Sequence, residues 1–316
     1  MKRLIIVGTL PETSYLGGVS IHVQRLLQSL DARGVDYSFC DYKSRGVMAS
    51  CLYVVGRRGC VHLHISNPIL LLLFVLCCKL SLSRCIFTLH GNYGRYSGVK
   101  RLCLEVALRL ADVPVAINEA SYEACRRVNA NTRFIPVFIP PLAETPLTGD
   151  VLQIVAACKE RRRPIVSTNA STYSTDKDGN DVYGIDFLVG YFSAHPEYTL
   201  LISDPKGAYR QQYPETADNV VFIAQPHSYY ELLKQVDVFV RNTSTDGDAL
   251  SVKEALSLNV PALCTDSVNR PSGVILFRYS DQESFALALE EAKKQPGTGS
   301  EYAANDVVDR LVELYS

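Results

Sequence analysis

The sequence lacks several features that would mark a specialised class of protein. Its formal net charge is −1 over 316 residues, so no overall field attracts nucleic acid or an anionic membrane. It contains no G-x-G-x-x-G loop, which disfavours a dinucleotide-dependent oxidoreductase. The apolar run 69–78 is about half of the roughly 20 residues that a membrane-spanning helix needs. It therefore predicts a buried helix, with a shallow membrane-facing role as the alternative.

Cysteine pairs with the C-x-x-C spacing of redox or zinc motifs are also absent. The chain has ten cysteines, but none of them forms a C-x-x-C pair. Most lie in apolar segments, as Cys77, Cys78 and Cys264 do, and the apolar run in 1–8 is too short for a secretory signal. Buried free thiols in a reducing compartment fit this pattern better than disulfides or zinc ligands. We therefore expect a cytoplasmic protein.

The apolar pattern predicts an α/β fold in two halves. A chain of this length is expected to form two domains, and strand-like apolar runs alternate with helical patterns in each half. We predict two Rossmann-like doubly wound domains facing a cleft. The expected parts are an N-terminal acceptor domain (1–145), a C-terminal donor domain (146–300) and a C-terminal helix that returns to the first domain (301–316).

Two histidines share one face of the predicted strand 61–65. His62 and His64 are separated by one residue, and strand side chains alternate between faces. An H-x-H pair can hold a metal, but no third ligand is evident from the sequence. We therefore favour their interpretation as polar residues at a strand end.

The segment 241–266 carries the most specific pattern. Asp246 and Glu254 flank a glycine-containing turn that leads from one predicted strand into a helix. A helix N-terminus suits a phosphate group, and nearby carboxylates suit sugar hydroxyls. This combination predicts a nucleotide-sugar site.

These residues carry a resemblance to a known family. Gly17-Gly18 after the first strand, Thr88-Leu-His90-Gly91, and Asp246 with Glu254 resemble GT-B-fold glycosyltransferases, and family 4 (glycosyl transferases group 1) in particular. The family has two glutamates separated by seven residues, and Asp246 replaces the first of them here. The resemblance implies sugar transfer from a nucleotide-diphosphate sugar to a hydroxyl acceptor, with retention at the anomeric carbon.

The resemblance also assigns roles to individual residues. Glu254 would bind the ribose, Asp246 would face the transferred sugar, and His90 would touch the donor sugar. The expected catalytic residues are His90, Asp246 and Arg241. The expected donor-binding residues are Gly17, Gly18, Asn169, Lys177, Gly247, Asp248, Ala249, Leu250, Ser251 and Glu254, and weaker candidates are His22, Asn92 and Arg270.

One departure concerns the cations that hold the diphosphate. The family usually offers an arginine and a lysine from the loop after the first strand of the second domain. Tyr183 occupies the usual lysine position here, so Lys177 or Arg241 is expected to replace it. A guanidinium matches phosphate bidentately without a metal.

The expected partners follow from the resemblance. We expect a nucleotide-diphosphate sugar as donor substrate, no cofactor or metal, and a glycan or lipid-linked glycan as acceptor. A role in cell-surface glycan or polysaccharide synthesis is implied, with peripheral contact at the inner face of the cell membrane and no nucleic acid. The alternatives are a catalytically silent sugar-nucleotide-binding or partner protein, and a sugar-nucleotide epimerase.

Overall fold

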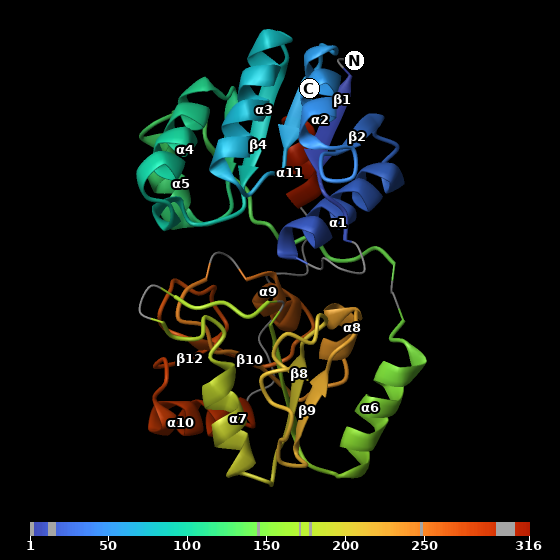
Figure 1. The fold of residues 1–316 in the computed structure, drawn as a ribbon, viewed down its shortest axis with the longest axis vertical. Coiled ribbons are helices and arrows are strands. Elements are labelled where there is room, and N and C mark those ends of the chain that lie inside the picture. The colour runs from blue at the N-terminus through green and yellow to red at the C-terminus, as the bar shows by residue number, and fades with distance from the viewer. Residues whose placement is uncertain are drawn as a thin grey trace. The chain divides into compact units, whose positions relative to one another are not determined.

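The chain forms two compact units. The computed structural model describes residues 3–11, 17–143, 146–170, 172–176, 179–246, 249–294 and 307–316 (Figure 1). Unit 1 comprises Met1–Leu142 and Asn305–Ser316, and unit 2 comprises Ala143–Ala304. Each unit contains one sheet of six parallel strands. The predicted α/β fold of two Rossmann-like units is confirmed.

The sheet of unit 1 has the strand order β2-β1-β3-β4-β5-β6. Its central strands are buried on both faces, which is why they read as continuous apolar runs rather than as alternating patterns. The strands are β1 (Leu4–Gly8), β2 (Tyr37–Asp41), β3 (Cys60–Leu63), β4 (Arg84–Leu89), β5 (Val113–Ala116) and β6 (Arg133–Phe134).

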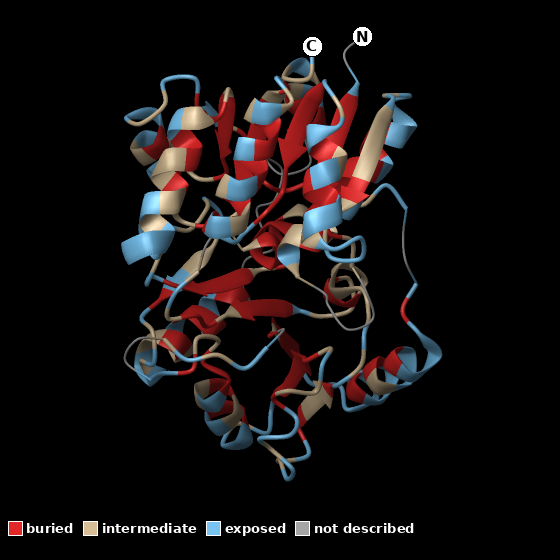
Figure 2. Ribbon diagram, turned by 45° about the horizontal axis from the view of Figure 1, so that its top comes forward, coloured by how far each residue is buried: buried red, intermediate tan, exposed pale blue. Residues whose placement is uncertain are grey.

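Helices cover both faces of this sheet (Figure 2). One face packs against α2 (Val47–Val55), α3 (Pro68–Leu80), α4 (Gly98–Leu110) and α5 (Glu119–Arg126), and the short 3-10 helix η1 (Tyr93–Arg95) precedes α4. The other face packs against α1 (Gly18–Ala32) and α11 (Val307–Glu313). The C-terminal helix therefore completes the core of unit 1.

Unit 2 has the strand order β12-β11-β10-β7-β8-β9. This is the strand order of the dinucleotide-binding fold. In that fold, successive strands are added outward in one direction and then in the other, starting from the first and fourth strands, here β7 and β10. The strands are β7 (Ile165–Asn169), β8 (Thr199–Ser203), β9 (Val220–Ile223), β10 (Val238–Arg241), β11 (Ala262–Thr265) and β12 (Ile275–Phe277).

The helices of unit 2 also lie on two faces. One face packs against α7 (Ile185–Ser193) and α10 (Gln282–Ala292). The other packs against α6 (Gly149–Glu160), α8 (Tyr229–Leu233) and α9 (Leu250–Ser257). The segment 241–266 thus belongs to the β10–loop–α9–β11 unit that its sequence pattern predicts.

One local expectation was wrong. The helix of the apolar run 69–78 is only half buried, because Ile69, Leu73 and Leu76 are exposed. Within the described part of the chain, no helix combines the length and hydrophobicity needed to cross a bilayer.

The packing of α11 generates a stability prediction. Leu311 is 2% exposed and contacts the core that α1 shares with β1. Leu311→Ala should lower the free energy of unfolding by roughly 2–5 kcal/mol, because it leaves a cavity in this core. Urea denaturation followed by circular dichroism measures the effect, and Glu313→Ala, on the exposed side of the same helix, is the control. Equal midpoints for the two variants would contradict the assigned packing.

Candidate functional site

The polar residues of unit 2 gather where winding reverses between β7 and β10. Ligands of open α/β sheets bind at this switch point, beyond the carboxyl ends of the strands. Asn169 is the last residue of β7, and Arg241 is the last residue of β10. Arg241 Nη1 donates to both the backbone oxygen and Oδ1 of Asn169, each at 3.2 Å. Two expected site residues therefore meet at the switch point.

Asp246 lies between two arginines. Its carboxylate accepts from Nε and Nη2 of Arg241, at 2.9 and 3.4 Å, and from Nη1 of Arg270, at 3.0 Å. Arg270 also donates to Thr243 and Thr265, which fixes its orientation. The three charged side chains are 4–11% exposed. The network is therefore buried, rigid and positively charged overall.

The two guanidiniums determine the protonation of Asp246. Burial raises the pKa of this carboxyl, but the charges and hydrogen bonds of Arg241 and Arg270 outweigh burial and lower the pKa from 3.8 to about 2. Burial lowers the pKa of Arg241, but the charge and hydrogen bonds of Asp246 raise it by more, so the pKa of Arg241 lies above its usual value. The network therefore keeps two positive charges and one negative charge at neutral pH.

Glu254 lies on α9, the helix that follows the loop after β10. It is 4% exposed, and Ala249 is the residue that precedes the helix. Burial raises the pKa of the Tyr229 phenol, which packs against this side of the sheet. Leu250 and Ser251 form the first turn of α9. Lys177, Gly247 and Asp248, which were expected to bind the donor, lie outside the described residues.

The residue in place of the usual lysine contacts Arg241. The Arg241 guanidinium carbon lies 5.1 Å from the centre of the Tyr183 ring, a cation–π distance. Gly184 follows with a φ of 55°, and a Cβ there would lie 2.3 Å from Asn242 Nδ2. The glycine thus brings the Tyr183 segment close to the strand that carries Arg241.

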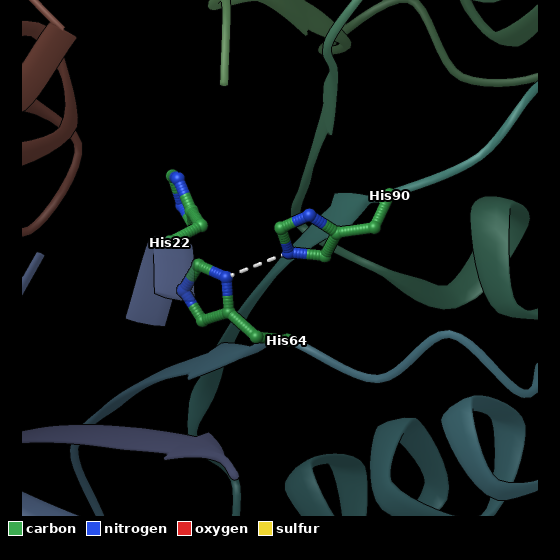
Figure 3. Close-up of side chains that lie close together, drawn as sticks. All are labelled: His22, His64 and His90. Carbon is green, nitrogen blue, oxygen red and sulfur yellow. Dashed lines mark hydrogen bonds between the residues drawn. The ribbon is translucent and has the colours of Figure 1, made fainter. Parts of the chain in front are cut away.

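Unit 1 brings three histidines together at its own switch point, between β1 and β3. His22 lies on α1, His64 directly follows β3, and His90 directly follows β4; Figure 3 shows the three side chains close together, with a hydrogen bond between His64 and His90. The ring centroids are 5.1–5.3 Å apart, and His64 Nδ1 lies 3.0 Å from His90 Nε2. His64 is the residue that the sequence interpretation missed, although the H-x-H spacing pointed to it.

The partner in the H-x-H pair has a different role. His62 Nδ1 lies 2.8 Å from the Tyr315 hydroxyl and its Nε2 lies 2.9 Å from Thr88 Oγ1, so both ring nitrogens are hydrogen-bonded. Burial, together with His22, lowers the pKa of His62 to about 3. Burial also lowers the pKa of His64 and of His90 well below the usual range. These three imidazoles are therefore neutral at pH 7.

The remaining expected residues of unit 1 lie at the starts of helices. Gly17 precedes α1. Its amide donates to the Ser20 hydroxyl, and that hydroxyl donates to the Gly17 carbonyl oxygen. A Cβ at Gly18 would meet no atom within 4 Å, so packing among the described residues does not require this glycine. Asn92 accepts a bond from Asn118 at 3.0 Å.

Comparison with known proteins identifies the fold. No family model and no curated protein sequence matches the chain. Solved structures do match: Anabaena HepE in complex with UDP and glucose (11% identity, TM-score 0.68, 100% of this chain and 95% of that chain) and sucrose-phosphate synthase from Thermosynechococcus elongatus (15%, 0.64, 100% and 95%). WaaG, a glycosyltransferase involved in lipopolysaccharide biosynthesis, matches at 11% identity and TM-score 0.65, over 99% of each chain. The chain therefore has the GT-B fold along its whole length.

The buried network generates a pH prediction. The lowered pKa of Asp246 means that its contribution to stability, about 2 kcal/mol, is present above pH 4 and disappears as the pH falls toward 2. Asp246→Asn should therefore destabilise the protein at pH 7, with a difference from the wild type that shrinks between about pH 4 and pH 2.

Urea denaturation across this pH range tests the prediction. Glu290→Gln is the control, because Glu290 pairs with Lys293 on the surface and its loss should change little. A difference between wild type and Asp246→Asn that stays constant down to pH 2 would show that the ion pairs do not stabilise the fold.

Proposed function

We propose that the chain is a glycosyltransferase that moves a sugar from a nucleotide-diphosphate sugar to a hydroxyl acceptor. The first domain would bind the acceptor and the second the donor, in the synthesis of a cell-surface glycan or polysaccharide. The fold supports this proposal, because HepE, which shares it, has been solved with UDP-glucose. The observation that carries the proposal is the arginine pair at the switch point of unit 2.

The arginine pair suits a diphosphate. Among the described residues, Arg241 makes four N–H hydrogen bonds within the protein, and so does Arg270. Both guanidiniums are therefore oriented before a ligand arrives, and their pairing with one carboxylate leaves a net positive charge. Preorganised charges of this kind stabilise a leaving group without reorganising during the reaction.

The transfer step follows from these roles. The bond between the anomeric carbon and the diphosphate oxygen breaks as the acceptor hydroxyl attacks the same face, which retains the anomeric configuration. The departing diphosphate takes the acceptor proton and both electrons of the broken bond. Arg241, Arg270 and the N-terminus of α9 would balance its charge, so the step needs no metal at the diphosphate. His90 would contact the donor sugar.

The proposal predicts turnover and a ribose-dependent effect of Glu254. The wild type should release nucleoside diphosphate from one member of a panel of nucleotide sugars. Glu254→Gln should weaken binding of the matching ribonucleoside diphosphate by roughly 10- to 100-fold, because a hydrogen bond to a charged group is worth about 1.5–3 kcal/mol. Binding of the 2′,3′-dideoxy analogue should change little, as measured by calorimetry.

A matched control and the contrary outcomes complete this test. Glu283→Gln alters an exposed glutamate of the same unit and should leave binding unchanged. Equal losses of affinity for the ribonucleotide and its dideoxy analogue would show that Glu254 does not contact the ribose hydroxyls. Binding without turnover on any donor would favour the catalytically silent alternative, and interconversion of the sugar would favour an epimerase.

Unit 1 also carries a surface that supports the expected membrane contact. α2 and α3 pack side by side and expose a row of large apolar side chains, which we call the α2–α3 face. Its members are Met48, Leu52, Ile69, Leu73, Leu76 and Leu80. The segment 42–104, which contains this face, has nine lysines and arginines and no aspartate or glutamate. We propose that the α2–α3 face binds an anionic membrane surface.

The membrane proposal predicts a charge-dependent affinity for vesicles. Arg58→Gln with Lys100→Gln should weaken binding to phosphatidylglycerol vesicles by roughly 30-fold, since each basic residue near the surface contributes about 1 kcal/mol. Leu76→Gln with Leu80→Gln should weaken binding further, whereas Leu287→Gln, an exposed leucine of unit 2, should not. Sedimentation with vesicles measures binding. Equal affinity for phosphatidylcholine vesicles would exclude the electrostatic part.

A further inference from the structure

The three histidines of unit 1 have the composition of a transition-metal site. His22, His64 and His90 each offer one ring nitrogen, and these three atoms lie within 4.8 Å of one another. His22 and His64 are 2% and 1% exposed, and His90 is half-buried. Imidazole nitrogen suits Zn²⁺, Cu²⁺ and Ni²⁺, whereas Mg²⁺ and Ca²⁺ prefer oxygen. We propose that this cluster binds one Zn²⁺ ion through the three imidazoles.

The spacing of the rings fits one central ion. Their centroids form a nearly equilateral triangle with sides of 5.1–5.3 Å (Figure 3). The point equidistant from all three lies about 3 Å from each centroid. A zinc ion bonded in the plane of an imidazole at about 2.0–2.1 Å lies at a similar distance from its centroid.

The hydrogen bonds around the cluster favour coordination by His22. Its Nδ1 lies 2.7 Å from the backbone oxygen of Val137, which can only accept, so Nδ1 carries the proton. In the neutral ring, Nε2 then holds the lone pair. Metal-bound histidines commonly donate their second nitrogen to a carbonyl in this way, which fixes the ring and strengthens the ligand.

The other two ligands need one proton to move. A single proton lies between His64 Nδ1 and His90 Nε2. Coordination by both nitrogens requires that this proton shift to the far nitrogen of the ring that holds it, so both rings stay neutral and no net proton is released. His64 Nε2 has no hydrogen-bond partner among the described residues, so only the bond to His90 holds its ring nitrogens. An ion that replaces this bond can therefore turn the ring.

Three ligands leave one coordination position for water or another small ligand. The same ion would join α1 to the ends of β3 and β4, three segments of unit 1 that are far apart in the sequence. Binding to the folded state alone stabilises a protein, so zinc should raise the melting temperature. The inference does not depend on the proposed sugar transfer, because binding and melting are measured without a nucleotide sugar.

The test uses the full chain after chelator treatment. Calorimetry with Zn²⁺ should give one ion per chain, and Co²⁺ should give the visible absorption of a four-coordinate site, while Mg²⁺ should not bind. His90→Gln should weaken Zn²⁺ binding by at least about 100-fold, because losing a residue that only supports a metal ligand already lowers metal affinity by about 10- to 100-fold. The zinc-dependent rise in melting temperature should disappear with it.

His62→Gln is the matched control. It removes an imidazole whose ring centroid lies 4.1 Å from that of His64, but both nitrogens of His62 are already hydrogen-bonded. This variant should bind Zn²⁺ with nearly wild-type affinity and, if it is less stable, still be stabilised by the ion. The proposal is overturned if the wild type binds no Zn²⁺, or if His90→Gln binds it as tightly as the wild type. His64→Gln removes another proposed ligand and should weaken Zn²⁺ binding in the same way as His90→Gln.

Discussion

A parallel sheet covered by helices on both faces can present polar side chains to a ligand only where its strands end. Both units of this chain obey that constraint. Their strand interiors are mostly apolar, although His62 and Thr88 are buried within the sheet of unit 1. The polar groups of both candidate sites lie beyond the carboxyl ends of strands, near a winding reversal. In unit 2 this position brings Asn169 to Arg241, and in unit 1 it brings His22, on the helix after β1, to His64 at the end of β3. The fold thus decides where chemistry is possible before any particular residue is considered.

The arginine network bears on the lysine position that the sequence resemblance assigned to Tyr183. The Tyr183 ring lies against Arg241. The positive charges come from the end of β10 and from the loop after β11, where Arg270 lies. Asp246 joins these two arginines, which gives a carboxylate at this position a structural use besides any contact with a sugar.

The sequence predicted those elements whose local patterns are strong. The apolar strands and the turn into α9 have clear signals, and the site candidates Asn169, Arg241 and Asp246 prove to be neighbours. β2 was missed because it is mostly half-buried, at the edge of its sheet. α2 was missed although most of its residues are apolar, because they do not gather clearly on one helix face. The histidine cluster required knowledge of strand order. His22 and His90 are far apart in the chain, and only the placement of β1, β3 and β4 side by side brings them to His64.

The two polar clusters differ in how they respond to a ligand. The guanidiniums of unit 2 stay charged at all ordinary pH values, and ion pairs fix them in place, so they favour an anion with little rearrangement. The imidazoles at the end of β3 and β4 are neutral because burial makes their protonation costly. A neutral imidazole can donate to one group and accept from another, and it can also use its lone pair for a metal ion. Burial therefore makes unit 1 suitable for hydroxyl groups or a transition metal, and it makes unit 2 suitable for phosphate.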